Sequence, residues 1–226
     1  MVFVRAEEGP PNFGPDEPYT VQYFDENGNM IIRSGGTKAW RNNNPGNMVH
    51  IKNGFAVRHG AIGKAKGMAI FPDEAIGRKA LVDLLRSVNY NNLQIKALTE
   101  KYDKDNAKSY LEMLLSISKL DQNKRVKDLT STEFNRLREA IERIEGWTIG
   151  REDFIEKWYI TGTHKKRGVI QEYLIRKSEG EAWVAKENAV HLAGQGRLHA
   201  VIVHRQNGSV FLRPEYGAKP FLLVKV

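Results

Sequence analysis

The sequence has no cysteine among its 226 residues. A disulfide framework, a thiolate nucleophile and a cysteine-ligated metal are therefore excluded. It also has no apolar run approaching the roughly 18 to 20 residues that cross a bilayer as a helix, so we expect no membrane insertion. Residues 1–5 lack the charged-then-apolar order of a secretory signal. This predicts synthesis in the cytoplasm, with transport by other means if the protein acts elsewhere.

Metal-binding patterns are scarce as well. The chain has six histidines, and none occurs in a His-Glu-x-x-His arrangement. Without cysteine, a metal site would need carboxylates gathered from distant segments. We therefore expect neither a metal nor another cofactor.

Positive charge is what the chain has in excess, a formal +8 with an isoelectric point near 9.5. Such an excess favours a polyanionic partner, such as nucleic acid, anionic lipid or the acidic bacterial envelope, although it also serves solubility alone. The sequence has no aromatic-and-basic RNA-binding motif and no helix-turn-helix with a basic face. Nucleic acid is therefore not the partner that we expect.

Residues 1–35 are predicted to form an arm followed by a β-hairpin. Residues 1–18 are rich in proline and glycine and have no apolar period, which is typical of a linker or an extended arm. Residues 21–24 and 30–33 are strand-like, and Asn27-Gly28 between them accepts the positive φ that a tight hairpin requires.

Residues 36–163 are predicted to form a helical domain. A segment dense in asparagine and glycine, residues 40–67, is expected to be irregular. Asp73 is expected to cap the first long helix, and Thr130 with Glu133 forms a capping box for the last. Apolar residues at helical spacing place the helices near residues 73–88, 91–101, 106–119 and 130–145.

Residues 164–226 are predicted to form a small α+β domain. After Gly162 the composition changes to Lys165-Lys166-Arg167, a basic run whose common meaning is a solvated linker. Strand-like stretches, a short helix near 185–194 and a hairpin around Asn207-Gly208 follow. The sequence therefore predicts a mainly α fold, with the helical domain between an N-terminal β-hairpin and this C-terminal domain.

Glu145 is the residue of the helical domain best suited to chemistry. It lies four residues after Ile141 and eleven after Phe134, which places it at the edge of the buried stripe and at the end of its helix. Partial desolvation and the negative end of the helix dipole disfavour an ionised carboxylate, so we expect a raised pKa, as a general acid near neutral pH requires. The alternative is an ordinary solvated glutamate. Trp147 beside it offers an aromatic face for a ligand or for the core.

Motifs spread over residues 36–150 resemble a known family. They are Arg41-Asn42-Asn43-Asn44-Pro45-Gly46-Asn47, His59-Gly60-Ala61-Ile62-Gly63, residues 67–75, and Ile144-Glu145-Gly146-Trp147 followed by Gly150. Together they resemble the lysozyme-like peptidoglycan hydrolases found in phage proteins and interbacterial effectors. Residues 168–226 resemble a small domain of unknown function that follows such hydrolases.

The resemblance implies a lysozyme-like fold that acts on the amino-sugar backbone of peptidoglycan, with Glu145 as general acid. Asn42, Asn44 and Asn47 would shape the site or contact sugar hydroxyl and acetamido groups, because each amide both donates and accepts. The alternative for them is an Asx-turn scaffold. The other expected substrate-binding residues are His59 and Trp147.

The second catalytic carboxylate is less well defined. Asp105 stands in the run 103–107, where the family commonly has an acidic-Asn-Asp-Thr sequence before a helix. Here the order is changed, so Asp105 would substitute from a neighbouring position or the activity would be altered. Asp73 is a further candidate, although an N-cap is its more common role. Lytic cleavage with Glu145 as a single acid/base group stays open.

Our leading hypothesis is an antibacterial toxin that cleaves glycan strands in the periplasm of a target bacterium, after delivery by a contact-dependent machine such as type VI secretion. Its expected partners are peptidoglycan, an immunity protein and a secretion-system carrier. The alternatives are a phage wall-degrading structural protein and a non-catalytic peptidoglycan-binding module in which the changed segment 103–107 has removed turnover. A nucleic-acid binder is a third hypothesis, which the charge alone motivates.

Overall fold

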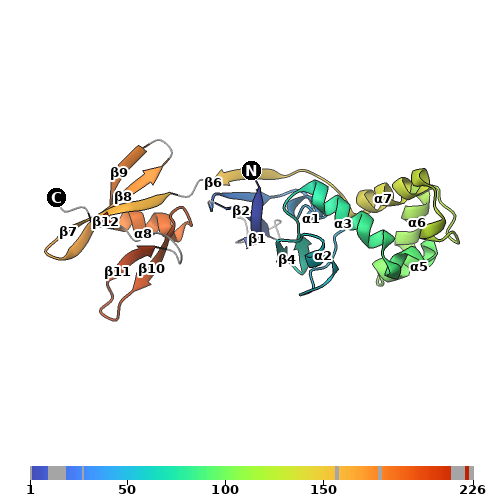
Figure 1. Ribbon diagram of the computed structural model, residues 1–226, viewed down its shortest axis with the longest axis horizontal. Coiled ribbons are helices and arrows are strands. Elements are labelled where there is room, and N and C mark those ends of the chain that lie inside the picture. Colours follow the sequence, from blue (N-terminus) through green and yellow to red (C-terminus); the bar gives the residue numbers. More distant parts are fainter. Residues whose placement is uncertain are drawn as a thin grey trace. The chain divides into compact units, whose positions relative to one another are not determined.

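The computed structural model describes residues 2–9, 19–26, 28–155, 158–177, 180–214 and 222–223. Backbone contacts divide the chain into two compact units, both drawn in Figure 1. The first unit consists of residues 1–26 and 31–153, and the second of residues 27–30 and 154–226. The three-part organisation into residues 1–35, 36–163 and 164–226 stays a prediction.

The first unit contains a six-stranded mixed sheet with the strand order β5-β4-β1-β2-β3-β6. Strand β1 pairs antiparallel with β2 and parallel with β4, so that Ala6 has Tyr23 on one side and Gly63 on the other. A Cβ on Gly63 would lie 1.7 Å from the carbonyl oxygen of Ala6, so only glycine permits this approach. The strands are β1 (Phe3–Gly9), β2 (Thr20–Asp25), β3 (Met30–Ser34), β4 (Gly63–Ala65), β5 (Met68–Ile70) and β6 (Arg151–Ile155).

Helices form the other part of the first unit (Figure 1), and their main core is made by leucines from four of them. Leu81, Leu98, Leu114 and Leu137 come from α3, α5, α6 and α7, and all are fully buried. Burying one leucine contributes roughly 1.5–3 kcal/mol, so these contacts hold the four helices together. The helices are α1 (Lys38–Arg41), α2 (Phe55–Arg58), α3 (Glu74–Arg86), α4 (Val88–Asn91), α5 (Ile95–Tyr102), α6 (Ala107–Ser118), η1 (Val126–Asp128) and α7 (Ser131–Glu145).

Two predicted helix caps are confirmed. The carboxylate of Asp73 accepts from the backbone N–H of Ile76 at 2.8 Å, where α3 begins. Thr130 and Glu133 form the reciprocal capping box at the start of α7. In the part of the chain that the structure describes, no helix is long and apolar enough to cross a membrane.

The prediction of a mainly α fold is wrong. The structure is mixed, with 36% helix and 33% strand. Residues 3–9, which we assigned to an extended arm, form β1, and the remainder of that arm, residues 10–18, lies outside the described residues. The sequence of β1, FVRAEEG, has little apolar character because this strand is held by backbone hydrogen bonds to β2 and β4 on its two sides. Such pairing leaves no apolar period to read.

The second unit is built around helix α8 and two sheets, β12-β7-β8-β9 and β10-β11. Helix α8 contacts strands of both sheets, and the hydroxyl of Tyr173 in β8 accepts from the backbone N–H of Leu212 in β11 at 2.8 Å. Tyr173 and Ile175 are fully buried in its core. Its elements are β7 (Tyr159–Lys166), β8 (Val169–Lys177), β9 (Gly180–Ala185), α8 (Lys186–Gly194), β10 (Ala200–His204), β11 (Val210–Pro214) and β12 (Leu222–Leu223).

Candidate active site

The asparagine loop, residues 42–47, follows α1 and is fixed by its own side chains. The amide nitrogen of Asn44 donates to the carbonyl oxygens of Met48 and Ala69, both at 2.9 Å, and its oxygen accepts from the N–H of Met48. Asn43 and Asn47 have φ angles of 49° and 44°, in the left-handed region that asparagine tolerates better than most residues. The loop therefore has a defined shape, set largely by Asn44.

Helices α3 and α5 approach this loop closely. A Cβ on Gly77 of α3 would lie 1.8 Å from the carbonyl oxygen of Asn43, so the helix backbone lies directly against the loop. The hydroxyl of Tyr102, at the end of α5, donates to the carbonyl oxygen of Gly46 at 2.5 Å. The loop is thus attached to the helical core immediately before Asn47.

Thr37 joins the start of α1 to the segment that follows α7. Its hydroxyl donates to the carbonyl oxygen of Gly146 at 3.3 Å and accepts from the N–H of Thr148 at 3.1 Å. Gly36 allows the two backbones to meet, because a Cβ on it would lie 2.4 Å from the carbonyl oxygen of Thr148. These contacts bring the end of α7 to the asparagine loop.

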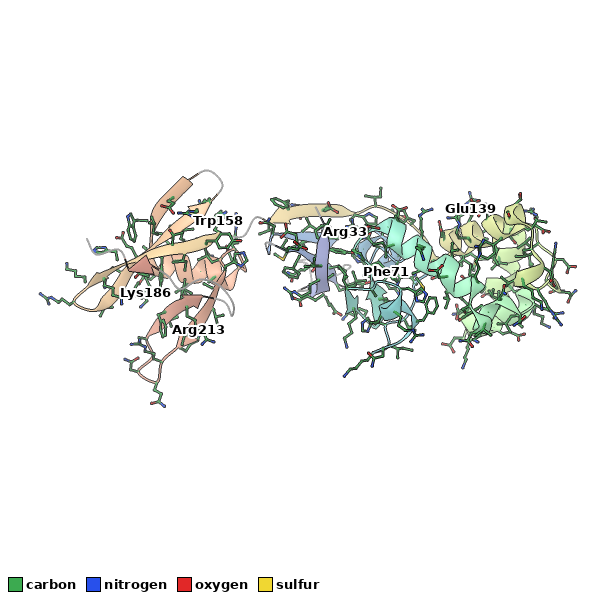
Figure 2. All side chains as sticks on the ribbon, viewed as in Figure 1. Arg33, Phe71, Glu139, Trp158, Lys186 and Arg213 are labelled. Atoms are coloured by element: carbon green, nitrogen blue, oxygen red, sulfur yellow. The ribbon has the colours of Figure 1, made fainter. Side chains whose placement is uncertain are left out.

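Arg33 of β3, labelled in Figure 2, reaches the same loop from the sheet. Its guanidinium donates to the carbonyl oxygen of Trp40 at 3.0 Å and to the side-chain oxygen of Asn43 at 2.6 Å. Its Nε donates to Glu152 of β6 at 2.8 Å. One side chain therefore links the loop, β3 and β6.

Glu145 lies where these segments meet. Its Oε2 accepts from the amide nitrogen of Asn47 at 2.8 Å, and its Oε1 lies 2.9 Å from the hydroxyl of Tyr110 in α6. An amide N–H only donates, whereas a hydroxyl both donates and accepts. Oε1 can therefore gain or lose a proton without losing its partner, which is the property that a proton-transferring carboxyl group needs.

The tyrosines near Glu145 remain neutral. Burial raises the pKa of Tyr110, and the charges of the neighbouring Tyr102 and Glu145 raise it further. Burial and the charge of Glu145 likewise raise the pKa of Tyr102 well above its usual value. Tyr110 is therefore a neutral hydrogen-bond partner of Glu145 near neutral pH.

The other two predicted amides lie inside the protein. Asn42 and Asn44 are both fully buried, and the carbonyl oxygen of Asn42 accepts from the N–H of Phe71 at 2.9 Å. A fully buried amide does not reach a ligand, and the side-chain hydrogen bonds of Asn44 to Met48 and Ala69 fit the scaffold alternative for that residue. Asn47 is the predicted amide that meets Glu145.

Asp73, Asp105 and His59 lie elsewhere. Asp73 is engaged as the cap of α3, and Asp105 is exposed in the turn before α6. His59 stacks on Phe55 with the ring centroids 3.8 Å apart, and its Nδ1 is 2.8 Å from the carbonyl oxygen of Phe55. Their roles in a site stay predictions, to which the geometry of Glu145 adds no support.

Trp147 lines an open cleft of about 560 Å³ beside the end of α7. Among the residues described, Glu145 itself is not part of the cleft wall. The aromatic face of Trp147 is therefore presented to a space adjoining the carboxylate's segment, not to the carboxylate itself.

Sequence reasoning missed Tyr110, Tyr102 and Asp103. Tyr110 belongs to the apolar face of the predicted helix 106–119, and Tyr102 follows the predicted helix 91–101, so neither hydroxyl gave a sign of a distant partner. The charge of Asp103 is the smallest of the causes that raise the pKa of Tyr110, and its carboxylate accepts from the N–H of Asn106 at the start of α6, whereas its neighbour Asp105 is exposed. The changed run 103–107 was the signal that pointed to this segment.

Within the described residues, no three histidine, aspartate or glutamate side chains form a group that could hold a metal ion. Neither the protein-family models nor the curated proteins compared with this chain match it. The family resemblance accordingly remains a prediction that rests on the quoted motifs.

Proposed function

We propose that this protein cleaves the glycan strands of peptidoglycan, with Glu145 as the group that transfers the proton. The observation that carries the proposal is the 2.8 Å hydrogen bond between Asn47 and Glu145. It joins the last residue of the asparagine motif to the Ile-Glu-Gly-Trp motif, and these are the two most specific segments of the resemblance. Two segments that resemble parts of one family's site are thus in direct contact.

The proton chemistry follows from the two partners of Glu145. Asn47 orients the carboxyl group through Oε2, and Tyr110 accepts from a protonated Oε1 or donates to an ionised one. Protonated Glu145 would donate its proton to the glycosidic oxygen as the bond from that oxygen to the anomeric carbon breaks. A water molecule or a hydroxyl of the same sugar would then add to that carbon and return a proton to Glu145.

The experiment is digestion of purified peptidoglycan sacculi, with soluble muropeptides identified by mass. We expect the wild type to release them, Glu145→Gln to lose at least 100-fold in rate, and Glu100→Gln to retain the wild-type rate, because Glu100 is exposed on α5. Equal release by wild type and Glu145→Gln would refute the catalytic assignment. The ends of the released fragments would identify the bond that is cleaved.

A non-catalytic peptidoglycan-binding module is the second candidate. The exposure of Asp105, in a run that departs from the resembling family, favours it. Its signature is sedimentation of the protein with sacculi, without release of soluble fragments and unchanged by Glu145→Gln. Delivery into a target periplasm by a secretion system, and an immunity protein as partner, belong to our proposal as the setting in which cleavage would act as a toxin.

A further inference from the structure

The cleft beside the end of α7 has a basic and aromatic wall. Its volume is about 560 Å³, and α7, α3 and α6 all contribute to it. The side chains that matter for binding are Arg136, Arg143, Arg78, Glu142, Ile117 and Trp147. Glu139, labelled in Figure 2, lies on the exposed side of α7 at the same cleft.

The acidic groups of this cleft are already neutralised. Glu142 is nearly buried and receives Arg78 at 3.0 Å and Arg138 at 2.9 Å. Glu139 pairs with Arg138 at 3.2 Å. The two carboxylates of the cleft are thus paired with Arg78 and Arg138. They therefore do not neutralise the other arginines of the cleft.

Arg136 and Arg143 are those other arginines. Within the described part of the chain, neither forms an ion pair with a carboxylate, and Nε of Arg136 is buried with no hydrogen-bond partner. Both arginines line the cleft, so their guanidinium groups face an incoming acceptor there. A guanidinium also offers a planar fork of donors that matches a carboxylate.

The position of the cleft relates it to the proposed acid. Trp147 follows Glu145 by two residues, so their Cα atoms are separated by at most about 7 Å. Arg136 and Arg143 are seven residues apart on one stripe of α7, a rise of roughly 10 Å. Trp147 and Ile117 add apolar surface to the same cleft. A polymer whose backbone lies at Glu145 would hold its substituents at this cleft.

We propose that the cleft binds the carboxylates of the peptide substituents that the glycan strand carries. The inference rests on the proposed function and adds a second recognition element to it. The amino-sugar rings of peptidoglycan are uncharged, and its carboxylates belong to the attached peptides. Arg136 and Arg143 bind these carboxylates, and Trp147 packs against the adjoining apolar atoms, so the enzyme would select glycan that bears peptides.

The test measures binding by calorimetry in a Glu145→Gln background, in which cleavage is blocked. One probe is a soluble disaccharide-peptide, and the other is a peptide-free N-acetylglucosamine oligomer. We expect Arg136→Gln/Arg143→Gln to weaken binding of the disaccharide-peptide at least tenfold and to leave the oligomer unchanged. Arg143→Gln alone, at an exposed position, should show part of the loss, and Arg125→Gln, an exposed arginine outside the cleft, should show none.

Three results would overturn the proposal. The first is unchanged affinity of the double variant for the disaccharide-peptide. The second is an equal loss for both probes, which would mean that the two arginines do not distinguish glycan that carries peptide. The third is that inorganic polyphosphate displaces the peptide probe whereas carboxylates do not. That result would mean that the arginines bind phosphate. In each case, sacculus digestion by the wild type would still decide the proposed function separately.

Discussion

The side-chain amide of Asn47 donates to Oε2 of Glu145 at 2.8 Å, across 98 residues of sequence. Asn47 achieves this from a backbone φ of 44°, at the end of a loop that Asn44 and the hydroxyl of Tyr102 hold in place. The contact therefore depends on a left-handed residue that also carries an amide. Asparagine and aspartate are the side chains that combine this backbone tolerance with the required length.

Asn47→Asp tests this contact through charge. The variant keeps the size and backbone tolerance of asparagine but places a second carboxylate against Glu145. Two carboxylates at this separation do not both ionise readily, so the pair retains a proton to higher pH. We expect the limb of the pH–rate profile that Glu145 controls to move to higher pH, measured by release of soluble fragments from sacculi.

Asn47→Gly is the matched variant for that experiment. Glycine adopts the same φ and removes the amide without adding charge. It should lower the rate and move the profile to higher pH by less than Asn47→Asp does, because the loss of one donor disfavours an ionised carboxylate less than an adjacent negative charge does. Identical profiles for Asn47→Asp and the wild type would mean that Asn47 does not contact Glu145 in solution.

Tyr110→Phe removes the hydroxyl from Oε1 of Glu145 and leaves the ring in the core. Because a hydrogen bond to a charged group is worth roughly 1.5–3 kcal/mol, we expect the rate to fall by about 10- to 100-fold. The effect should be on kcat, since the hydroxyl orients the proton-transferring group and is not expected to contact the sugar. A change in KM alone, with kcat retained, would contradict this role. Tyr90→Phe is the control, as Tyr90 packs against Tyr102 and has no described contact with Glu145.

The helices of this protein could be predicted from local sequence. The predicted 73–88 and 106–119 correspond to α3 (Glu74–Arg86) and α6 (Ala107–Ser118), because apolar spacing and caps are local signals. The sheet could not be predicted in the same way. Strand β1 has partners in two distant segments, and β4 and β5 are three-residue strands within a glycine-rich stretch.

The candidate site was predictable only in part, for the same reason. Glu145 and Asn47 lie in distinctive motifs, so each could be selected without a structure. Their hydrogen bond requires Thr37, Gly36 and the closing of α7 onto the asparagine loop, and no local pattern encodes a contact between segments so far apart. Asp103 was missed because it differs from Asp105 in being partly buried, and burial depends on the tertiary structure.

Gly36→Ala tests the close approach that brings the end of α7 to the loop. Gly36 and Gly67 have φ angles of 59° and 79°, so alanine is strained at both positions, by about 1–2 kcal/mol. Only at Gly36 would the new Cβ also meet backbone, at 2.4 Å from the carbonyl oxygen of Thr148; nothing lies within 4 Å at Gly67. We expect Gly36→Ala to cost roughly 3–4 kcal/mol and to lower Tm by about 10 °C, measured by calorimetry.

Gly67→Ala supplies the control for backbone strain, and its Tm should fall by only about 2–5 °C. Activity at a temperature where both variants are folded adds a second reading. Gly36→Ala should lose activity there, since Thr148 and Gly146 move with the end of α7. Equal losses of stability in the two variants would show that the two backbones are not in contact at Gly36.

Glu133 makes the start of α7 sensitive to pH. Its carboxylate accepts from Lys124 Nζ at 2.8 Å and from the N–H of Thr130 at 2.8 Å, and these bonds lower its pKa from 4.5 to about 2. A folded-state pKa below the unfolded value stabilises the protein above pH 4.5, and that contribution disappears as the pH falls toward 2. Glu133→Gln should therefore have a lower Tm than the wild type at pH 7, and the two Tm values should converge as the pH approaches 2. Glu100→Gln, at an exposed position on α5, should follow the wild type throughout.

A constant difference between Glu133→Gln and the wild type from pH 7 to pH 2 would mean that the charge of Glu133 is not engaged by Lys124 and Thr130, and that the capping box does not fix the helix that ends at Glu145.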